Sequence, residues 1–244
     1  VGVSEAHAEG ACPALFVLGI QGTGESSEDA SPTTDSGMLS RVMQPLLTMA
    51  GSMVQRAYVP YPAGFGGAVK GGKQSFEVSA QKAVDRATSM TTQIAERCPE
   101  SAFAYTGYSQ GAYALSILLK EIGSGSGPIP ADKVAGASLF GDPTRPAGAG
   151  LFPGKDGATK PEPAPGTEGS AVEALSDREL PTATGGGIGP TKESTTSFGE
   201  LDGRVASSCE GGDLACDAPT DAPVTHIVAN IAGSSTLDQS DPVQ

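Results

Sequence analysis

The chain has 244 residues, a formal net charge of −13 and a pI near 4.5. Such an acidic chain is repelled at long range by nucleic acids and anionic membrane surfaces, so we expect no nucleic-acid partner. The length allows one sizeable hydrophobic core, while 34 glycines and 19 prolines indicate a compact body with much loop. We therefore predict a single domain over residues 1–244 and a monomer.

Strand-like and helix-like segments alternate along the first part of the chain. Apolar runs predict strands at 14–20, 54–59, 102–106 and 134–140, and apolar residues at helical spacing predict helices at 36–53, 75–97 and 110–122. Pro45 should kink the first helix or mark a fresh start. A further strand is expected at 204–208, and the apolar segment 224–232 is a helix candidate. This alternation predicts an α/β fold, a mostly parallel central sheet with helices on both faces in a three-layer sandwich.

The alternation stops between residues 143 and 203, where Pro, Gly, Thr, Ser and Glu dominate. This composition is typical of an insert within the domain, with short elements expected only at 171–175 and 198–201. No apolar run approaches the roughly 20 residues that span a bilayer, so we expect no transmembrane segment. The N-terminus lacks a basic region followed by an apolar one, so a signal segment was either removed or never present.

The four cysteines, Cys12, Cys98, Cys209 and Cys216, allow three pairings if all are bridged. Cys209 and Cys216 flank a Gly-Gly-Asp turn, so a local bridge is easy and leaves Cys12 to meet Cys98. Four free, buried thiols are the alternative. A metal site is not expected, because there is no Cys-x-x-Cys pair and the chain has only two histidines. Two disulfides would imply an oxidising compartment, hence secretion or the cell envelope.

The segment Gly107-Tyr108-Ser109-Gln110-Gly111 lies between a predicted strand and a predicted helix. A serine between two glycines at a strand-to-helix turn is how an α/β-hydrolase presents its nucleophile. The glycines are needed because the turn is strained and packs closely against its neighbours. Ser109 is therefore the predicted nucleophile of an acyl-transfer reaction.

A serine hydroxyl needs a neighbouring base, and histidine suits that task because its pKa lies near neutrality. His7 lies in a polar N-terminal stretch, where a solvated residue is expected, whereas His226 follows the last predicted strand, so we assign the base to His226. A capping or packed histidine is the alternative.

The carboxylate that orients this histidine should lie between the serine and the histidine in the chain. Asp213 fits this order and lies within the loop that a Cys209–Cys216 bridge would hold rigid. Asp142, Asp217 and Asp221 lie outside that loop and are better interpreted as solvated or turn-capping residues. Asp213 could itself be such a turn residue.

Two donors should face the oxyanion of the tetrahedral intermediate. One is the backbone N–H of Gln110, directly after the nucleophile, and the second is expected from Gly22-Thr23-Gly24, where Thr23 also offers a hydroxyl. An ordinary turn or part of a phosphate loop are the alternatives for the latter segment, but phosphate loops use a lysine that is missing here.

Together these segments resemble the cutinase family of serine esterases. The stretch from Arg97-Cys98-Pro99 to Gly107-Tyr108-Ser109-Gln110-Gly111-Ala112 is similar to that family's nucleophile region, and residues 209–216 are similar to its disulfide-closed aspartate loop. The resemblance implies a cutinase-like α/β-hydrolase fold with Ser109, Asp213 and His226 as the triad. It also implies Thr23 and Gln110 as the oxyanion residues and a Cys12–Cys98 disulfide. The long segment 143–203 departs from small fungal cutinases and is more like the cell-envelope cutinase-like proteins of mycolic-acid bacteria.

We therefore expect a secreted or envelope-associated esterase or lipase that hydrolyses lipid-like carboxylic esters through an acyl-enzyme and requires no cofactor. Phospholipase A, acyl-thioesterase and acyltransferase activities on envelope lipids are the alternatives, since the same triad could run them. A non-catalytic lipid-binding protein on a hydrolase scaffold is the competing class. The 143–203 insert leaves the sheet beside the catalytic end, so we expect it to fold over the cleft as a mobile flap.

Overall fold

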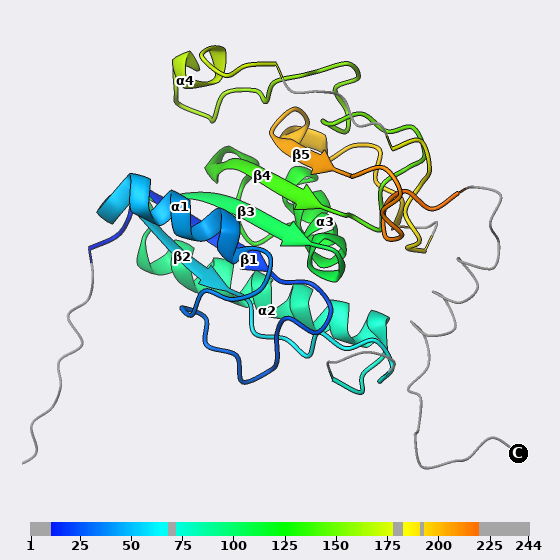
Figure 1. Cartoon of the computed structure of the whole chain (residues 1–244). Helices are drawn as coiled ribbons and strands as arrows, with labels where there is room; N and C mark the ends of the chain where they lie inside the picture. Colours follow the sequence, from blue (N-terminus) through cyan, green and yellow to red (C-terminus); the bar gives the residue numbers. More distant parts are fainter. Residues whose placement is uncertain (1–10, 68–71, 178–182, 191–192, 220–244) are drawn as a thin grey trace, which may run out of the picture.

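Five strands form one parallel sheet in a computed structural model that describes residues 11–67, 72–177, 183–190 and 193–219. The strands are β1 (Leu15–Ile20), β2 (Val54–Tyr58), β3 (Ala102–Tyr108), β4 (Val134–Phe140) and β5 (Val205–Ser208). Their order in the sheet is β2-β1-β3-β4-β5, and their carboxyl ends lie at the same edge (Figure 1). The order reverses between β1 and β3, and sheets of this kind bind ligands in the crevice beyond the strand ends at the reversal.

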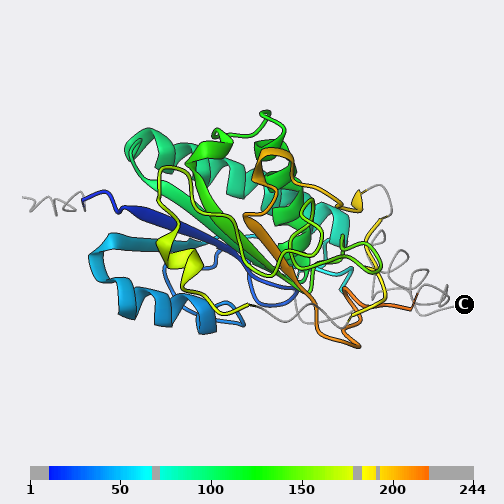
Figure 2. The same cartoon turned by 90° about the horizontal axis from the view of Figure 1, so that it is seen from above.

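Helices cover both faces of this sheet. Helices α2 (Phe76–Arg97) and α3 (Gln110–Gly123) lie on one face, and α1 (Ser40–Ala50) and the short α4 (Ser170–Glu173) lie on the other (Figure 2). The predicted α/β architecture with helices on both faces is therefore confirmed. None of the helices within the described ranges is long and apolar enough to cross a membrane.

Helix α3 packs within the larger hydrophobic cluster, against the sheet and beside α2. Leu115, Leu118, Leu119 and Ile122 are each fully buried, and burial of one such side chain stabilises the fold by about 2 kcal/mol. Side chains of β1 alternate between the two faces, as expected for a strand covered on both sides. The helix that follows the serine turn is thus buried over most of its surface.

The expected elements agree with the structure except near their ends. The first helix is shorter than predicted and runs through Pro45, which does not mark a fresh start. Helix α2 begins one residue after Ser75, whose Oγ caps it by accepting a hydrogen bond from the Val78 N–H at 3.3 Å. Strand β3 continues two residues beyond the predicted end, to Tyr108. The helix candidate at 224–232 lies outside the described residues.

Both predicted disulfides are present. Cys12–Cys98 joins the chain before β1 to the end of α2, and Cys209–Cys216 closes the loop after β5. In a chain-entropy treatment, the first, which spans 86 residues, stabilises the fold by about 4.6 kcal/mol because it restricts the unfolded chain. The expectation of two bridges rather than free thiols is confirmed.

The insert differs from the expected flap. Its short elements, α4 and a 3-10 turn at Gly199–Leu201, form where the sequence indicates. However, residues 151–177 lie along the face of the sheet that also carries α1, where Leu151, Phe152 and Val172 face the strands (Figure 2). This stretch therefore covers a sheet face and not the catalytic edge, and Leu151 and Phe152 are buried there.

Gly111, in the first turn of α3, allows a close backbone approach near the catalytic edge. A Cβ at this position would lie 2.0 Å from the Ile20 carbonyl oxygen and 2.5 Å from that of Gln21. Both atoms belong to the backbone and cannot move aside independently. Helix α3 can start against the end of β1 only if residue 111 has no side chain.

We predict that Gly111→Ala lowers the free energy of unfolding by at least about 3 kcal/mol, although alanine is the better helix former, because the added methyl group overlaps backbone atoms. Chemical denaturation monitored by circular dichroism provides the measurement. Gly150→Ala is the matched control, since nothing lies within 4 Å of a Cβ at that position. Equal stabilities for the two variants would contradict the prediction.

Candidate active site

Ser109 lies between β3 and α3 in a backbone conformation that side-chain-bearing residues rarely adopt. Its φ is 52° and its ψ is −116°, and it is one of two non-glycine residues with positive φ in the described ranges. Its N–H donates to the Phe140 carbonyl at 2.8 Å, and its carbonyl accepts from the Tyr113 N–H at 3.0 Å. Such strain persists only where the surroundings fix it, and it is common at functional sites.

The two glycines of the motif both have steric roles. A Cβ at Gly107 would lie 2.8 Å from the Ala112 Cα and from the Gly111 carbonyl oxygen. Together with the contact of Gly111 against β1, this holds a half-buried Ser109 at the start of α3. The predicted strand-to-helix turn around Ser109 is thus observed in the structure.

Gln110 is fully buried, and hydrogen bonds fix its side chain. Its Nε2 donates to the Gly64 carbonyl at 2.8 Å, and its Oε1 accepts from the Ser79 hydroxyl at 2.8 Å. The Ser79 hydroxyl in turn accepts from the Gly64 N–H at 3.0 Å. This network leaves the backbone N–H of Gln110 at the positive end of α3, where it suits an anion.

The loop that carries Thr23 follows β1 and lies beside the serine turn. A Cβ at Gly22 would lie 2.7 Å from the ring of Tyr108, the residue before Ser109. Glu25 holds the loop, because its Oε2 accepts from the Gly22 N–H at 3.1 Å and its Oε1 from the Met38 N–H at 3.0 Å. Thr23 is half-buried at this position.

The loop that carries Asp213 lies on the other side of Tyr108. A Cβ at Gly141 would be 3.3 Å from Asp213 Oδ2 and 3.9 Å from the Tyr108 ring. Gly22 and Gly141 thus both lie beside the Tyr108 ring, and Gly141 also lies next to Asp213. Burial, followed by the charges of Glu25 and Asp213, raises the pKa of Tyr108. The structure therefore brings the Thr23 loop, Ser109 and Asp213 to one edge of the sheet.

Asp217 and Asp142 have structural roles. Asp217 accepts hydrogen bonds from the N–H groups of Gly212 and Gly185, at 2.7 and 2.6 Å. These bonds lower its pKa, so its ionised form stabilises the fold above its usual pKa of about 4 and loses that effect as the pH falls through the native value.

Asp142, at the end of β4, is buried and accepts from the hydroxyl groups of Ser116, at 2.6 Å, and Thr144, at 2.8 Å. Burial raises the pKa of Asp142. Its interpretation as a turn-capping residue is supported by the Thr144 N–H that it accepts at 2.8 Å, whereas solvation of Asp142 is ruled out.

Arg145 is a buried residue that the sequence did not single out. Its guanidinium donates to the carbonyls of Ala149, Gly185 and Ala183 at 2.7 to 2.9 Å, and to that of Cys216 at 3.4 Å. Burial lowers its pKa. Arg145 thus ties the end of the insert to the disulfide loop of Asp213. No sequence pattern could reveal it, because all its partners are backbone carbonyls.

Backbone hydrogen bonds strengthen this connection between the insert and the aspartate loop. Gly186 and Ala218 form an antiparallel bridge, and the Ile188 N–H donates to the Ala215 carbonyl at 3.1 Å. The loop between Cys209 and Cys216 is therefore held by its disulfide, by residues 183–190 and by Arg145.

Aromatic side chains adjoin the first turn of α3 and were also not predicted. Phe65, Phe76 and Tyr113 form a chain of edge-on contacts, with ring centroids 5.8 and 5.0 Å apart. Burial, followed by nearby carboxylates, raises the pKa of Tyr113 to about 12. These rings provide an apolar surface one helical turn from Ser109.

The two histidines considered for the base, His7 and His226, both lie outside the described residues, as does Asp221. Their positions relative to Ser109 therefore stay predictions.

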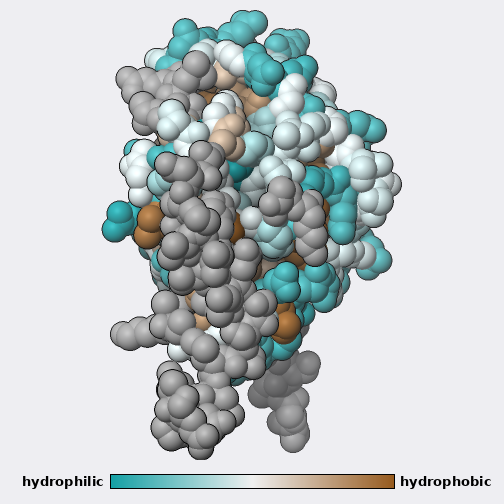
Figure 3. Space-filling model, turned by 90° about the vertical axis from the view of Figure 1, so that its right-hand side faces the viewer, coloured by the Kyte–Doolittle hydropathy of each residue, from teal (hydrophilic) through white to brown (hydrophobic). Residues whose placement is uncertain are grey.

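The surface at this end of the molecule is mixed in character. Figure 3 looks onto the side that the strand ends face, and its coloured part shows small hydrophobic areas separated by hydrophilic ones. One exposed apolar side chain, Leu214, directly follows Asp213 and is 70% exposed.

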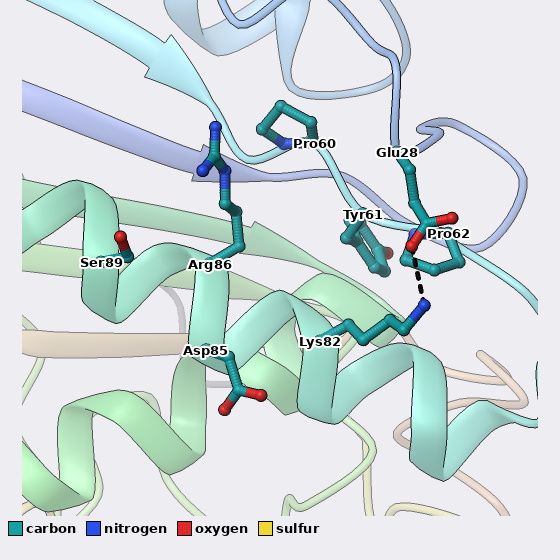
Figure 4. Close-up of a pocket in the computed structure, with 8 residues that line it drawn as sticks. All are labelled: Glu28, Pro60, Tyr61, Pro62, Lys82, Asp85, Arg86 and Ser89. Atoms are coloured by element: carbon teal, nitrogen blue, oxygen red, sulfur yellow. Dashed lines mark hydrogen bonds and ion pairs between the residues drawn. The ribbon is translucent and has the colours of Figure 1, made fainter.

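A pocket of about 400 Å³ lies on the α2 side of the loops that follow β1 and β2 (Figure 4). Its Lys82 and Glu28 form an exposed ion pair at 2.7 Å, which contributes little to stability. The Tyr61 hydroxyl at its wall donates to the Gln21 carbonyl at 2.6 Å. The wall of this pocket thus supports the start of the Thr23 loop. None of the residues that line the pocket is a candidate for the predicted triad.

Known proteins resemble this chain in sequence and in fold. The family model described as Cutinase matches residues 11–236. The Carboxylesterase Culp6 homolog of Corynebacterium glutamicum is 31% identical over 220 residues, which cover 85% of this chain and 66% of that protein. The chain thus spans slightly less than two thirds of this relative's length.

Solved structures share the fold. The catalytic core domain of acetyl xylan esterase from Trichoderma reesei has a TM-score of 0.58 at 21% identity and covers 91% of this chain and 94% of that one. A cutinase-like protein from Cryptococcus sp. has a TM-score of 0.51 at 18% identity, and the match covers 92% of this chain and 98% of that one. The fold expected from the sequence is therefore confirmed.

We predict that Arg145→Met lowers the free energy of unfolding by about 3 kcal/mol, because buried carbonyls lose a charged donor. Urea denaturation provides the measurement. Arg41→Met is the matched control, since Arg41 is exposed. A loss no greater than that of the control would show that Arg145 does not hold the insert to the aspartate loop.

Proposed function

Because the chain belongs to the cutinase family, we propose that it is a serine esterase that hydrolyses carboxylic esters through an acyl-enzyme on Ser109. The observation that carries this proposal is the strained turn at Ser109, with a φ of 52° between a buried strand and a buried helix. That turn presents a hydroxyl beside the N–H groups at the start of α3, as acyl transfer requires.

In the proposed reaction His226 removes the proton from Ser109 Oγ, which attacks the ester carbonyl carbon. The carbonyl electron pair moves to oxygen, and the resulting oxyanion is stabilised by the Gln110 N–H and by Thr23. Collapse of this intermediate breaks the ester C–O bond, and the protonated His226 donates its proton to the leaving alcohol. Water then repeats these steps on the acyl-enzyme, releases the acid and restores Ser109. No step requires a metal or cofactor.

Asp213 is proposed to orient His226 and to stabilise its protonated form. Its Oδ1 accepts from the Ala215 N–H at 2.8 Å, while its Oδ2 faces Gly141 near Tyr108. The carboxylate oxygens of Asp217 and Asp142 are already engaged by backbone and hydroxyl donors. An oxygen that faces the serine edge makes Asp213 the best candidate among the three.

The reaction class is inferred from the family and from the carboxylesterase name of the Corynebacterium relative, which support a carboxylesterase and do not favour the phospholipase A, thioesterase or acyltransferase alternatives. We propose lipid-like esters as substrates and a monomer as the active form. The two disulfides agree with an extracellular or envelope location, which we also propose. We further propose one domain with an insert at 143–203.

We predict that Ser109→Ala lowers kcat for a soluble short-chain ester by at least about 10³-fold, because the acyl-enzyme cannot form. Release of 4-nitrophenol from 4-nitrophenyl butyrate is the measurement. Ser52→Ala, at an exposed serine, should retain full activity. An alkyl phosphonate should label Ser109 in the folded wild-type protein, and labelling elsewhere or equal activity of the two variants would refute the proposal.

We also predict different effects for two neighbouring carboxylates. Asp213→Asn should lower kcat by about 10⁴-fold, because the histidine loses its orienting partner. Asp217→Asn should retain kcat within about tenfold but unfold at lower urea concentration, because it weakens bonds to Gly212 and Gly185. Steady-state kinetics and urea denaturation of both variants distinguish the two roles. A greater loss of kcat in Asp217→Asn than in Asp213→Asn would show that Asp217, and not Asp213, orients the histidine.

A further inference from the structure

A cavity of about 810 Å³ lies on the face of the sheet that carries α1, between the strands and the insert. Its volume is within the roughly 300–1,000 Å³ that is typical of small-molecule sites. Small side chains of three strands line it, namely Ala104, Thr106, Gly136, Ser138, Ala206 and Ser208. The opposite walls include Leu46 of α1 and Leu151, Phe152, Val172 and Leu175 of the insert.

The space exists because the helices do not cover this face completely. Helix α1 packs against β2 and α4 has only four residues, whereas α2 and α3 fill the other face (Figure 2). Irregular chain from the insert spans β3, β4 and β5 on this side. A floor of small residues beneath apolar walls leaves room for a ligand.

One polar atom on the floor lacks a partner. Thr106 is 2% exposed, lines the cavity, and its Oγ1 makes no hydrogen bond within the part of the chain that the structure describes. A buried hydroxyl without a partner costs about 1–3 kcal/mol. Because this hydroxyl is buried and lines the cavity, it indicates a ligand that carries one hydrogen-bonding oxygen.

The charged groups of the cavity are already engaged. Arg204 donates to the carbonyls of Ala131 and Glu200 at 2.9 and 2.7 Å. Lys160 donates to the Glu173 carbonyl at 3.2 Å, and Glu162 pairs with Lys155 at 2.8 Å. Asp177 accepts from the Thr159 hydroxyl at 3.0 Å. No unengaged charge among these groups faces a ligand, so an uncharged ligand fits better than a carboxylate or phosphate.

The shape of the cavity favours a chain over a compact ring system. Its lining follows β4 from Ala135 to Phe140, a length of about 16 Å at roughly 3.3 Å per residue. At the carboxyl end it reaches Phe140 and Ser208. We propose that this cavity binds an alkyl or acyl chain that carries one uncharged oxygen, such as a fatty alcohol or the acyl part of an ester, with the oxygen bonded to Thr106.

The test uses dodecan-1-ol as the ligand and the full chain with Ser109→Ala, so that binding does not depend on the proposed esterase activity. Native mass spectrometry gives the stoichiometry, and the shift of thermal unfolding with ligand concentration gives the affinity. We expect one dodecan-1-ol per chain, and butan-1-ol to bind at least tenfold more weakly because it buries less apolar surface.

Added to this background, Ala206→Leu and Ser138→Leu fill the floor and should each weaken binding at least tenfold. Ala171→Leu is the matched control, because Ala171 is an exposed residue of α4, and it should leave affinity unchanged. Thr106→Val replaces the hydroxyl with a methyl group of similar size and should weaken binding about fivefold. Affinity is compared for variants that unfold cooperatively.

Absence of binding to the Ser109→Ala chain would overturn the proposal. Unchanged affinity in a folded Ala206→Leu or Ser138→Leu variant would overturn it as well. If Thr106→Val raised the unfolding temperature without weakening binding, the assigned role of the hydroxyl would be wrong. If the esterase proposal for Ser109 failed, in contrast, the binding results expected here would not change, because every binding measurement uses the Ser109→Ala chain.

Discussion

The approach of helix α3 to the end of strand β1 is the constraint on which the catalytic edge depends. At Gly111 the helix backbone lies so close to the Ile20 carbonyl that a methyl group would overlap it. The chain must therefore turn sharply between β3 and α3, and Ser109 takes up the strain with its positive φ. The same approach brings the first N–H groups of α3 next to the loop after β1. The positions of the nucleophile and of the proposed oxyanion donors thus both follow from one packing contact.

Much of this arrangement could be predicted because its signals are local. Continuous apolar runs identified the strands, helical spacing identified α2 and α3, and two glycines around Ser109 identified the turn. The ends of elements were less predictable, as the passage of α1 through Pro45 shows, since packing of Met43 and Leu39 against the sheet decides where that helix forms. Arg145 could not be predicted, because its partners are carbonyls from remote segments that share no pattern of side chains.

The insert illustrates the limit of composition as a guide. Its abundance of proline and glycine correctly indicates little regular structure, yet this says nothing of where the chain lies. Residues 183–190 hydrogen-bond to the aspartate loop, whereas residues 151–177 cover the sheet face that α1 leaves open. The two parts therefore have different neighbours, and a single flap over the cleft describes neither. Tertiary contacts, with the aspartate loop for 183–190 and with the sheet for 151–177, determine these positions more than local propensity does.

The three aspartates near the strand ends show how surroundings separate groups with identical chemistry. Asp142 is buried with hydroxyl and backbone donors, so it connects β4 to α3 and is inaccessible to a substrate. Asp217 binds two backbone N–H groups and fixes the loop from outside. Asp213 is half-buried and directs one oxygen toward the edge beside Tyr108. One oxygen of Asp213 accepts from the Ala215 N–H, so its other oxygen, Oδ2, is the one left to interact with an imidazole.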